Sequence, residues 1–120
     1  FQKHETGIDD KYFDIVIEGM YGAVNVPGGT ALVGKLNHIV ICGKTGTAQN
    51  PHGEDHSVFM AYAPRENPQI AIGILVENAG FGATWAAPIA SLMIEKYLTD
   101  TITRPALEKR ILEGNLMNTK

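Results

Sequence analysis

The sequence predicts an α+β fold, an antiparallel three-strand sheet flanked by helices. Apolar residues recur at helical spacing near each end of the chain, and three short apolar segments separated by polar turns lie between them. With 120 residues, of which 44% are hydrophobic, the chain suits one compact unit. We therefore expect a helix, three antiparallel strands and a second long helix, in that order.

The first helix is predicted over residues 10–24, where large apolar residues recur at steps of three and four. These residues are Phe13, Val16, Ile17, Met20 and Val24. Asp9 and Asp10 stand where an N-cap and a favourable negative charge belong. Gly19 predicts close packing against a neighbour, because glycine costs a helix interior about 1 kcal/mol relative to alanine. The turn-forming residues 25–29 end the helix.

Three strands are predicted over residues 38–48, 57–63 and 69–76. In the third strand, isoleucine and valine alternate with smaller residues and a leucine, so we expect both of its faces to be covered. The polar segment 64–68 fits a hairpin connection, and the polar segment 49–56 fits another antiparallel return. These connections make an antiparallel sheet the simplest arrangement.

The second long helix is predicted to begin near Thr84, with Pro88 in its first turn, where proline does no harm. Its apolar stripe is expected to consist of Trp85, Ile89, Leu92, Met93 and Tyr97, broadened by Ile94 and Leu98. Thr103 followed by Pro105 predicts a short terminal helix that ends at Gly114.

Composition and charge exclude several classes of protein. The formal net charge is −3, and no basic block of five or more residues occurs, so no nucleic-acid partner is predicted. The apolar runs are far shorter than the roughly 20 residues of a membrane span. A single cysteine, Cys42, excludes an internal disulfide and is expected to be a small buried hydrophobe. The opening without methionine indicates a fragment or a processed chain.

The segment Gly43–Gln49 admits two chemical interpretations. A phosphate-binding P-loop would need a glycine five residues before Gly43, where this chain has His38, and a helix directly afterwards. The preceding segment is an apolar strand and the following one a polar loop, so the nucleotide interpretation is rejected. The second interpretation is the Lys-Thr-Gly strand of serine acyl transferases that act on D-alanyl peptides or β-lactams.

The chemistry of such a strand accounts for each residue. Lys44 supplies a compact positive charge for the substrate's carboxylate. The hydroxyls of Thr45 and Thr47 can donate hydrogen bonds to that carboxylate. Gly46 leaves room for the substrate backbone to lie along the strand. The backbone N–H of Thr47 can form half of an oxyanion hole, in which one donor contributes about 3 kcal/mol of transition-state stabilisation.

Four stretches of the chain, spread over residues 13–98, resemble class B penicillin-binding proteins. They are Glu18-Gly19-Met20 with Val24 and Gly29-Thr30-Ala31; Lys44-Thr45-Gly46-Thr47-Ala48-Gln49; His56 with Phe59 and Ala63-Pro64; and Gly82-Ala83 with Ala86-Ala87-Pro88. Val58 departs from the pattern, because the family commonly has tryptophan there, and this changes the packing of the strand. The resemblance looks strongest to the elongation-specific members of the family, and it implies a partial penicillin-binding/serine β-lactamase-like transpeptidase fold.

The family also requires a Ser-x-x-Lys and a Ser-x-Asn motif, and this chain has neither. Ser57 and Ser91 lack lysine three residues later and asparagine two residues later. Residues 1–120 are therefore expected to be the C-terminal part of one transpeptidase domain, with the nucleophile and base outside the chain. The chain alone is expected to be inactive and to self-associate, because its sheet and first helix would lack neighbours.

For the whole protein, the resemblance implies a peptidoglycan D,D-transpeptidase that cross-links stem peptides and binds β-lactam antibiotics. It also implies an anchor in the cell inner membrane, a domain that faces the periplasm, and partner proteins of the cell-elongation machinery. No cofactor or metal is predicted. Two alternatives stay open: a serine β-lactamase-type or sensor domain, and a non-catalytic module that binds peptide or protein.

Two further pairs of residues are candidates for a site. His52 and His56, with acidic residues between them, have the spacing of metal ligands on a helix. Pro51 and Gly53 favour a polar loop instead, which by resemblance borders the substrate groove and can contact a stem peptide. The aromatic residues of the segment 81–85, Phe81 and Trp85, can face substrate, but packing in the core is the preferred interpretation for both.

Overall fold

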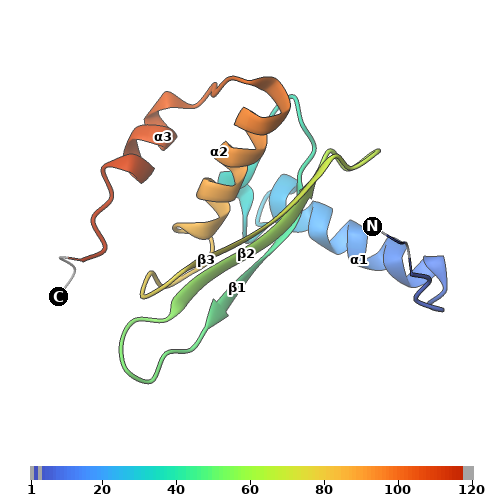
Figure 1. Cartoon of the computed structure of the whole chain (residues 1–120), viewed down its shortest axis with the longest axis horizontal. Helices are drawn as coiled ribbons and strands as arrows, with labels where there is room; N and C mark the ends of the chain where they lie inside the picture. Colours follow the sequence, from blue (N-terminus) through green and yellow to red (C-terminus); the bar gives the residue numbers. More distant parts are fainter. Residues whose placement is uncertain (1, 3, 118–120) are drawn as a thin grey trace.

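The computed structural model describes residue 2 and residues 4–117. Its elements follow the predicted order (Figure 1). They are α1 (Asp10–Asn25), the 3-10 turn η1 (Leu32–Gly34), β1 (Cys42–Ala48), β2 (His56–Ala63), β3 (Ile70–Val76), α2 (Ala86–Thr99) and α3 (Pro105–Leu112). The strands form an antiparallel sheet in the order β1-β2-β3. The predicted α+β class, with three antiparallel strands flanked by helices, is confirmed.

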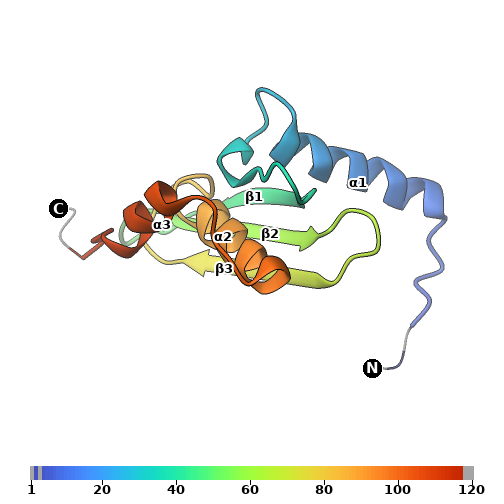
Figure 2. The same ribbon diagram turned by 90° about the horizontal axis from the view of Figure 1, so that it is seen from above.

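The helices cover the sheet unequally. In Figure 2, α2 lies across β2 and β3, while α1 runs alongside β1 at one edge. The short helix α3 packs on α2, on the side away from α1. None of the helices that the structure describes combines the length and the apolar character needed to cross a lipid bilayer.

The main core lies between α2 and the sheet. Phe59 on β2 and Ile94 on α2 have no exposed surface, and Phe59 stands opposite Thr45 on β1 and Ile74 on β3. Ala87 and Ala90 of α2 are also fully buried, and these small side chains let the helix approach the strands closely. Cys42 is buried as expected, and burial raises the pKa of its thiol.

The predicted apolar stripe of α2 is only partly buried: Leu92 and Ile94 are buried and Leu98 packs against the core, but two other members are exposed. Met93 and Tyr97 are 51% and 66% exposed, while Ala87, Ala90 and Ile94 of this helix belong to the core. The helix also begins at Ala86, not near Thr84, so that Pro88 still lies in the first turn as predicted. Large side chains dominate the sequence periodicity, but alanines also occupy buried positions of this helix, because small side chains let it approach the strands closely.

Three further expectations were wrong in detail. The first strand begins at Cys42, and residues 38–41 precede it as irregular chain. The outer face of β3 is open, because Leu75 is 59% exposed. Gly19 has no close neighbour: a Cβ atom there would meet nothing within 4 Å. For β3 and Gly19 the predicted neighbour is absent among the residues that the structure describes, whereas Val40 still accepts a hydrogen bond from the N–H of Arg65.

Helix α1 is capped as predicted, because the Asp9 side chain accepts a hydrogen bond from the backbone N–H of Lys11. Its C-terminal end is attached to the sheet. Asn25 donates from Nδ2 to the carbonyl oxygen of Ile41 at 2.8 Å, and Val24 is fully buried. The N-terminal half is open, since Val16 is 59% exposed. The predicted stripe of α1 therefore contacts the core only at its C-terminal end.

A buried ionic network joins α2 to the segment before α3. Glu95 has no exposed surface and accepts hydrogen bonds from the backbone N–H of Thr103 at 3.1 Å and from Nη2 of Arg104 at 3.1 Å. Arg104 Nη2 also donates to Ser91 Oγ at 2.8 Å. Burial alone would raise the pKa of Glu95, but the hydrogen bonds from Thr103 and Arg104, with the charge of Arg104, lower it below its ordinary value.

Two strand glycines form a matched test of this packing. Alanine at Gly43 would place its Cβ 2.5 Å from the Phe59 ring and 2.9 Å from the Ala61 Cβ, whereas alanine at Gly73 would meet nothing within 4 Å. We expect Gly43→Ala to lower the free energy of unfolding by about 2 kcal/mol, and Gly73→Ala to change it by less than about 0.5 kcal/mol. Urea unfolding followed by circular dichroism measures both. Equal effects of the two substitutions would contradict this description of the core.

Candidate functional site

The Lys-Thr-Gly segment lies on an edge strand, where it lines a cleft. Within the described residues, β1 pairs only with β2, so its other edge is open. A cavity of about 400 Å³ lies beside it. The lining comes from three separate parts of the chain: Thr30, Lys44, Thr45, Gly46, Thr47, Phe81, Gly82 and Ala83. All four predicted site residues are therefore found together at one cleft.

One ammonium group and two hydroxyls cluster in this cleft. Nζ of Lys44 donates to the carbonyl oxygen of Thr45 at 3.0 Å and to its Oγ1 at 3.3 Å. Oγ1 of Thr45 donates in turn to Oγ1 of Thr30 at 2.9 Å. These contacts are exposed, so an incoming ligand can reach them. A positive charge beside hydroxyl donors is suited to binding a carboxylate or another small anion.

The wall opposite β1 is held by close backbone contacts. A Cβ atom at Gly82 would lie 2.8 Å from the carbonyl oxygen of Gly46 and closer still to that of Val58, so only glycine fits. Ser57 Oγ donates to the carbonyl oxygen of Phe81 at 3.0 Å and accepts from the N–H of Ala86 at 3.1 Å. The segment before α2 is thereby fixed against β1 and β2.

The two aromatic residues of the segment 81–85 have different positions. Phe81 lines the cleft and is 75% exposed, so the expectation that it packs in the core was wrong. Trp85 is half-buried and packs against the C-terminal part of the chain. The Arg110 guanidinium lies 5.5 Å from the centre of its ring, and Gly114 lies against the ring. Trp85 does not line this cleft, which agrees with its predicted packing role.

The turn that carries Thr30 is also anchored on both sides. The N–H of Ala31 donates to the carbonyl oxygen of Ala23 on α1 at 2.8 Å. Ser91 Oγ on α2 donates to the carbonyl oxygen of Gly34 at 2.6 Å. The position of Thr30 beside Thr45 therefore depends on two helices that flank the turn.

The histidine pair lies in the connection from β1 to β2, at the end of the sheet. His56 begins β2, and its Nδ1 accepts a hydrogen bond from the N–H of Asn78 at 3.0 Å. His52 lies in the loop, where its backbone N–H donates to Oδ1 of Asn50 at 3.0 Å. Within the part of the chain that the structure describes, no group of three metal-ligating side chains comes together.

The two serines have structural contacts in this chain. Ser57 and Ser91 are both fully buried, and neither lines the cleft. Ser57 joins the sheet to the start of α2, and Ser91 joins α2 to η1. The cleft has no serine among its described lining residues, and its charged and hydroxyl groups come from Lys44 and three threonines.

Comparison with known proteins identifies the family. A model of the penicillin binding protein transpeptidase domain matches residues 2–95. The chain belongs to the penicillin-binding protein transpeptidase family. The Haemophilus influenzae peptidoglycan D,D-transpeptidase MrdA is 36% identical over 107 residues, which are 76% of this chain and 16% of that protein. The Mycobacterium tuberculosis transpeptidase PbpA is 37% identical over 76 residues, 54% of this chain and 15% of that protein.

Solved structures agree with this family assignment. Pseudomonas aeruginosa PBP2, in complex with WCK 5153, is 37% identical with a TM-score of 0.69 over 77% of this chain and 20% of that chain. Helicobacter pylori PBP2, in complex with MreC, is 28% identical with a TM-score of 0.67 over 83% of this chain and 20% of that chain. The predicted resemblance to class B penicillin-binding proteins, with PBP2 among the relatives, is confirmed. The described chain thus matches about a fifth of each solved structure.

Several lining residues of the cleft on β1 were not predicted from the sequence as site residues. Thr30, Gly82 and Ala83 lie in segments noted only for resemblance, and Phe81 was assigned to the core. The glycines around Phe81 were a usable signal, because glycines beside an exposed aromatic residue often let a backbone approach another closely. For Thr30 no local signal exists, since its contact with Thr45 crosses 15 positions of sequence.

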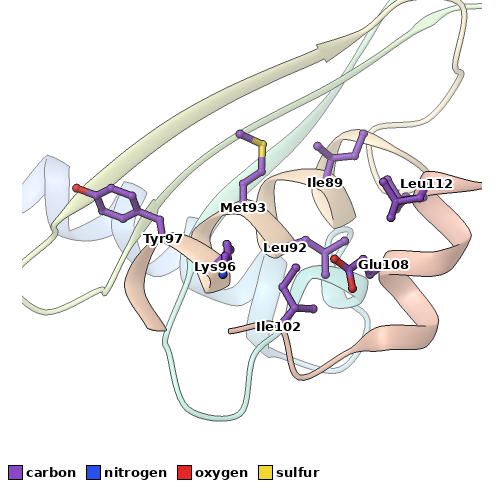
Figure 3. A pocket seen from close by; sticks show the side chains of 9 residues that line it. Ile89, Leu92, Met93, Lys96, Tyr97, Ile102, Glu108 and Leu112 are labelled. Carbon is purple, nitrogen blue, oxygen red and sulfur yellow. The ribbon is translucent and has the colours of Figure 1, made fainter. Parts of the chain in front are cut away.

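A second cavity of this transpeptidase domain is unrelated to the Lys-Thr-Gly strand. It has a volume of about 460 Å³ and lies between α2 and α3 (Figure 3). Leu92 and Ile102 face each other across it, and Met93 and Tyr97 stand at its α2 side. Most of its lining surface is apolar, and the lining residues that carry polar groups are Lys96, Tyr97 and Glu108.

Proposed function

We propose that residues 1–120 are the C-terminal part of one peptidoglycan D,D-transpeptidase domain and supply its substrate-binding strand. The observation that carries the proposal is the cleft on β1. There Lys44 and the hydroxyls of Thr45 and Thr30 gather beside an open strand edge. A peptide that ends in a carboxylate can lie along this edge and place its charge on that cluster.

In this proposal, Lys44 supplies the positive charge, and Thr45 and Thr47 donate hydroxyl hydrogen bonds to the terminal carboxylate. Gly46 leaves space for the peptide backbone. The N–H of Thr47 stabilises the oxyanion that develops on the scissile carbonyl. Support comes from the placement of these residues along one cleft, with a closely packed wall at Gly82 opposite.

The nucleophile of the reaction is a serine outside these residues. Its oxygen bonds to the carbonyl carbon of the penultimate D-alanine, and the terminal D-alanine leaves with a proton on its amine. An amine of a second stem peptide then attacks the ester, forms the cross-link and returns the proton to the serine. A β-lactam acylates the same serine. Ser57 and Ser91 are buried away from the cleft, which is consistent with a nucleophile elsewhere.

The partners proposed for the whole protein follow from its relatives. Related structures carry titles that name a complex of PBP2 with MreC and an imipenem acyl-enzyme of penicillin-binding protein A. We propose β-lactams, stem peptides, elongation proteins and the remaining half of the domain as partners. We also propose a location at the inner membrane, with this domain facing the periplasm. Two exposed apolar surfaces are the N-terminal half of α1 and the outer face of β3. In the whole protein, we propose that the remaining half of the transpeptidase domain covers them. In the isolated chain, we expect them to cause self-association.

Labelling with a fluorescent penicillin tests the proposal. The chain is compared with a long form, meaning a polypeptide that carries these residues together with the family's Ser-x-x-Lys and Ser-x-Asn motifs. We expect a covalent label on the long form only, because the nucleophile lies outside residues 1–120. A label on the isolated chain would contradict the proposed inactivity.

The same experiment separates the alternatives. A label on neither form would overturn the transpeptidase proposal and favour a peptide-binding module that uses the open edge of β1. A label on the long form that water removes within seconds would favour a β-lactamase-type domain, whose general base activates water. A stable label is the result expected for a transpeptidase.

A further inference from the structure

The hydroxyl of Thr45 has a fixed capacity for hydrogen bonds, and the structure shows how it is used. A hydroxyl has one proton to donate and two lone pairs that accept. In the structure, Thr45 Oγ1 accepts from Nζ of Lys44 at 3.3 Å and donates to Oγ1 of Thr30 at 2.9 Å. Its single proton is therefore occupied by Thr30 before any substrate arrives, and one lone pair is free.

A carboxylate in the cleft would require the opposite arrangement. It can only accept hydrogen bonds, so the proton of Thr45 must turn away from Thr30 and toward the ligand. The hydroxyl of Thr30 can then rotate and donate its own proton to the free lone pair of Thr45. In that state Thr45 accepts from Lys44 and from Thr30, and its only remaining bond is the one it donates to the carboxylate.

The backbone on the C-terminal side of Thr30 is anchored, which limits how far Thr30 must move in this exchange. Ala31 is fully buried, and its N–H donates to the carbonyl oxygen of Ala23 at 2.8 Å. Gly34 accepts from Ser91, which also accepts from Arg104, so the buried network around Glu95 extends to this turn. A hydroxyl on an anchored turn, which can either accept or donate, is suited to orienting a neighbouring hydroxyl.

We propose that Thr30 is a positioning residue of the carboxylate site: it accepts from Thr45 in the free cleft and donates to Thr45 when a carboxylate is bound. The inference rests on the proposed transpeptidase function and deepens it. Thr30 does not touch the reacting atoms. When a carboxylate is bound, Thr30 donates to Thr45, so the proton of Thr45 is directed to the ligand. Thr30 thereby increases the preference of the cleft for a ligand with a free carboxylate over an uncharged ligand.

The test uses the long form and compares two ligands. Second-order acylation rate constants are measured for a penicillin with a free carboxylate and for its methyl ester, and their ratio gives the carboxylate preference. Thr30→Val removes the hydroxyl but keeps the shape of the side chain, and Thr30→Ser restores the hydroxyl. We expect Thr30→Val to reduce the ratio about tenfold, as for the loss of one hydrogen bond to a charged system. The rate constant with the ester should fall much less than the rate constant with the acid, and Thr30→Ser should recover most of the ratio.

Combination with Thr45→Val separates the proposed role from a general disturbance. If Thr30 acts through Thr45, then Thr30→Val should have no further effect on the ratio in a Thr45→Val background. Equal losses for acid and ester, or an additive double variant, would show a structural role and overturn the inference. If the wild-type long form is acylated with a preference for the carboxylate while Thr30→Val shows the same ratio, that result would overturn only the role of Thr30. A wild-type long form that is never acylated would overturn the proposed function, and this inference with it.

Discussion

Replacement of Glu95 by alanine should lower the free energy of unfolding of this chain by about 3 kcal/mol. The carboxylate is fully buried and accepts hydrogen bonds from Thr103 and from Nη2 and Nε of Arg104. Without it, the guanidinium of Arg104, whose side chain is only 21% exposed, would have lost its partner charge. The loss should be large because an unpaired charge stays in the interior, not because an ion pair is strongly stabilising in itself.

The measurement is urea unfolding, followed by circular dichroism and by the fluorescence of Trp85, the only tryptophan. Glu66→Ala is the matched control, because Glu66 is 95% exposed beside Arg65 and its removal should change stability by less than about 0.5 kcal/mol. A loss below about 1 kcal/mol for Glu95→Ala would show that the buried network stabilises the chain no more than a surface pair does.

The lowered pKa of Glu95 also predicts that the free energy of unfolding depends on pH. The pKa of Glu95 lies below its ordinary value of 4.5 in the folded chain, so the unfolded chain binds a proton more readily at this position. The stability that Glu95 contributes should be fully present above pH 4.5 and should be lost as the pH falls through the lower folded-state pKa. In Glu95→Gln, this part of the loss of stability at low pH should be absent. If the stability of Glu95→Gln fell with pH as in the wild type, the acid dependence would not come from Glu95.

Replacement of Lys44 by methionine should reduce the acylation of the long form by a penicillin about a hundredfold. The ammonium group is the positive charge among the described lining residues of the cleft, and it also donates to Thr45 Oγ1. Methionine has a side chain of similar length and no charge. The decrease in the acylation rate constant therefore measures the contribution of the Lys44 charge and its hydrogen bonds. The effect should exceed that of Thr30→Val, since Lys44 contacts the ligand directly in the proposed complex.

Second-order rate constants measured at several salt concentrations provide the test. The wild-type rate constant should fall as salt screens the attraction between Lys44 and the carboxylate, and this dependence should be weaker in Lys44→Met. Lys109→Met is the matched control, because Lys109 is 71% exposed on α3, outside the cleft, and should leave the rate constant unchanged. Equal rate constants for Lys44→Met and the wild type would mean that the β1 cleft does not bind the carboxylate.

Local patterns predicted much of the fold. The caps and turn residues around α1 placed this helix to within a residue or two, because Asp9 and the breakers after Asn25 act on their immediate neighbours. The strands at His56–Ala63 and Ile70–Val76 were also recognised, because the polar turns between apolar runs mark their ends. The irregular chain before Cys42 was taken for strand, because an apolar run can be buried without pairing.

The burial of α2 shows the limit of such patterns. Its predicted stripe included Leu92 and Ile94, which are buried, but also Met93 and Tyr97, which are exposed, while the small Ala87 and Ala90 belong to the core. A helix whose small residues face the sheet can approach the strands closely, and Phe59 then fills the space between them. Which face is buried depends on the shape of the partner surface, and the sequence of the helix does not contain that information.

The sequence by itself determined the order and type of the elements, the family resemblance and the position of the Lys-Thr-Gly segment on a strand. These are local properties, set by hydrophobic spacing, turn residues and a short motif. Only the tertiary structure decided that Thr30 and Gly82 complete the cleft around Lys44 and Thr45. Their contacts join residues far apart in the chain, and they form only where helices and sheet pack closely enough to exclude any side chain at Gly82.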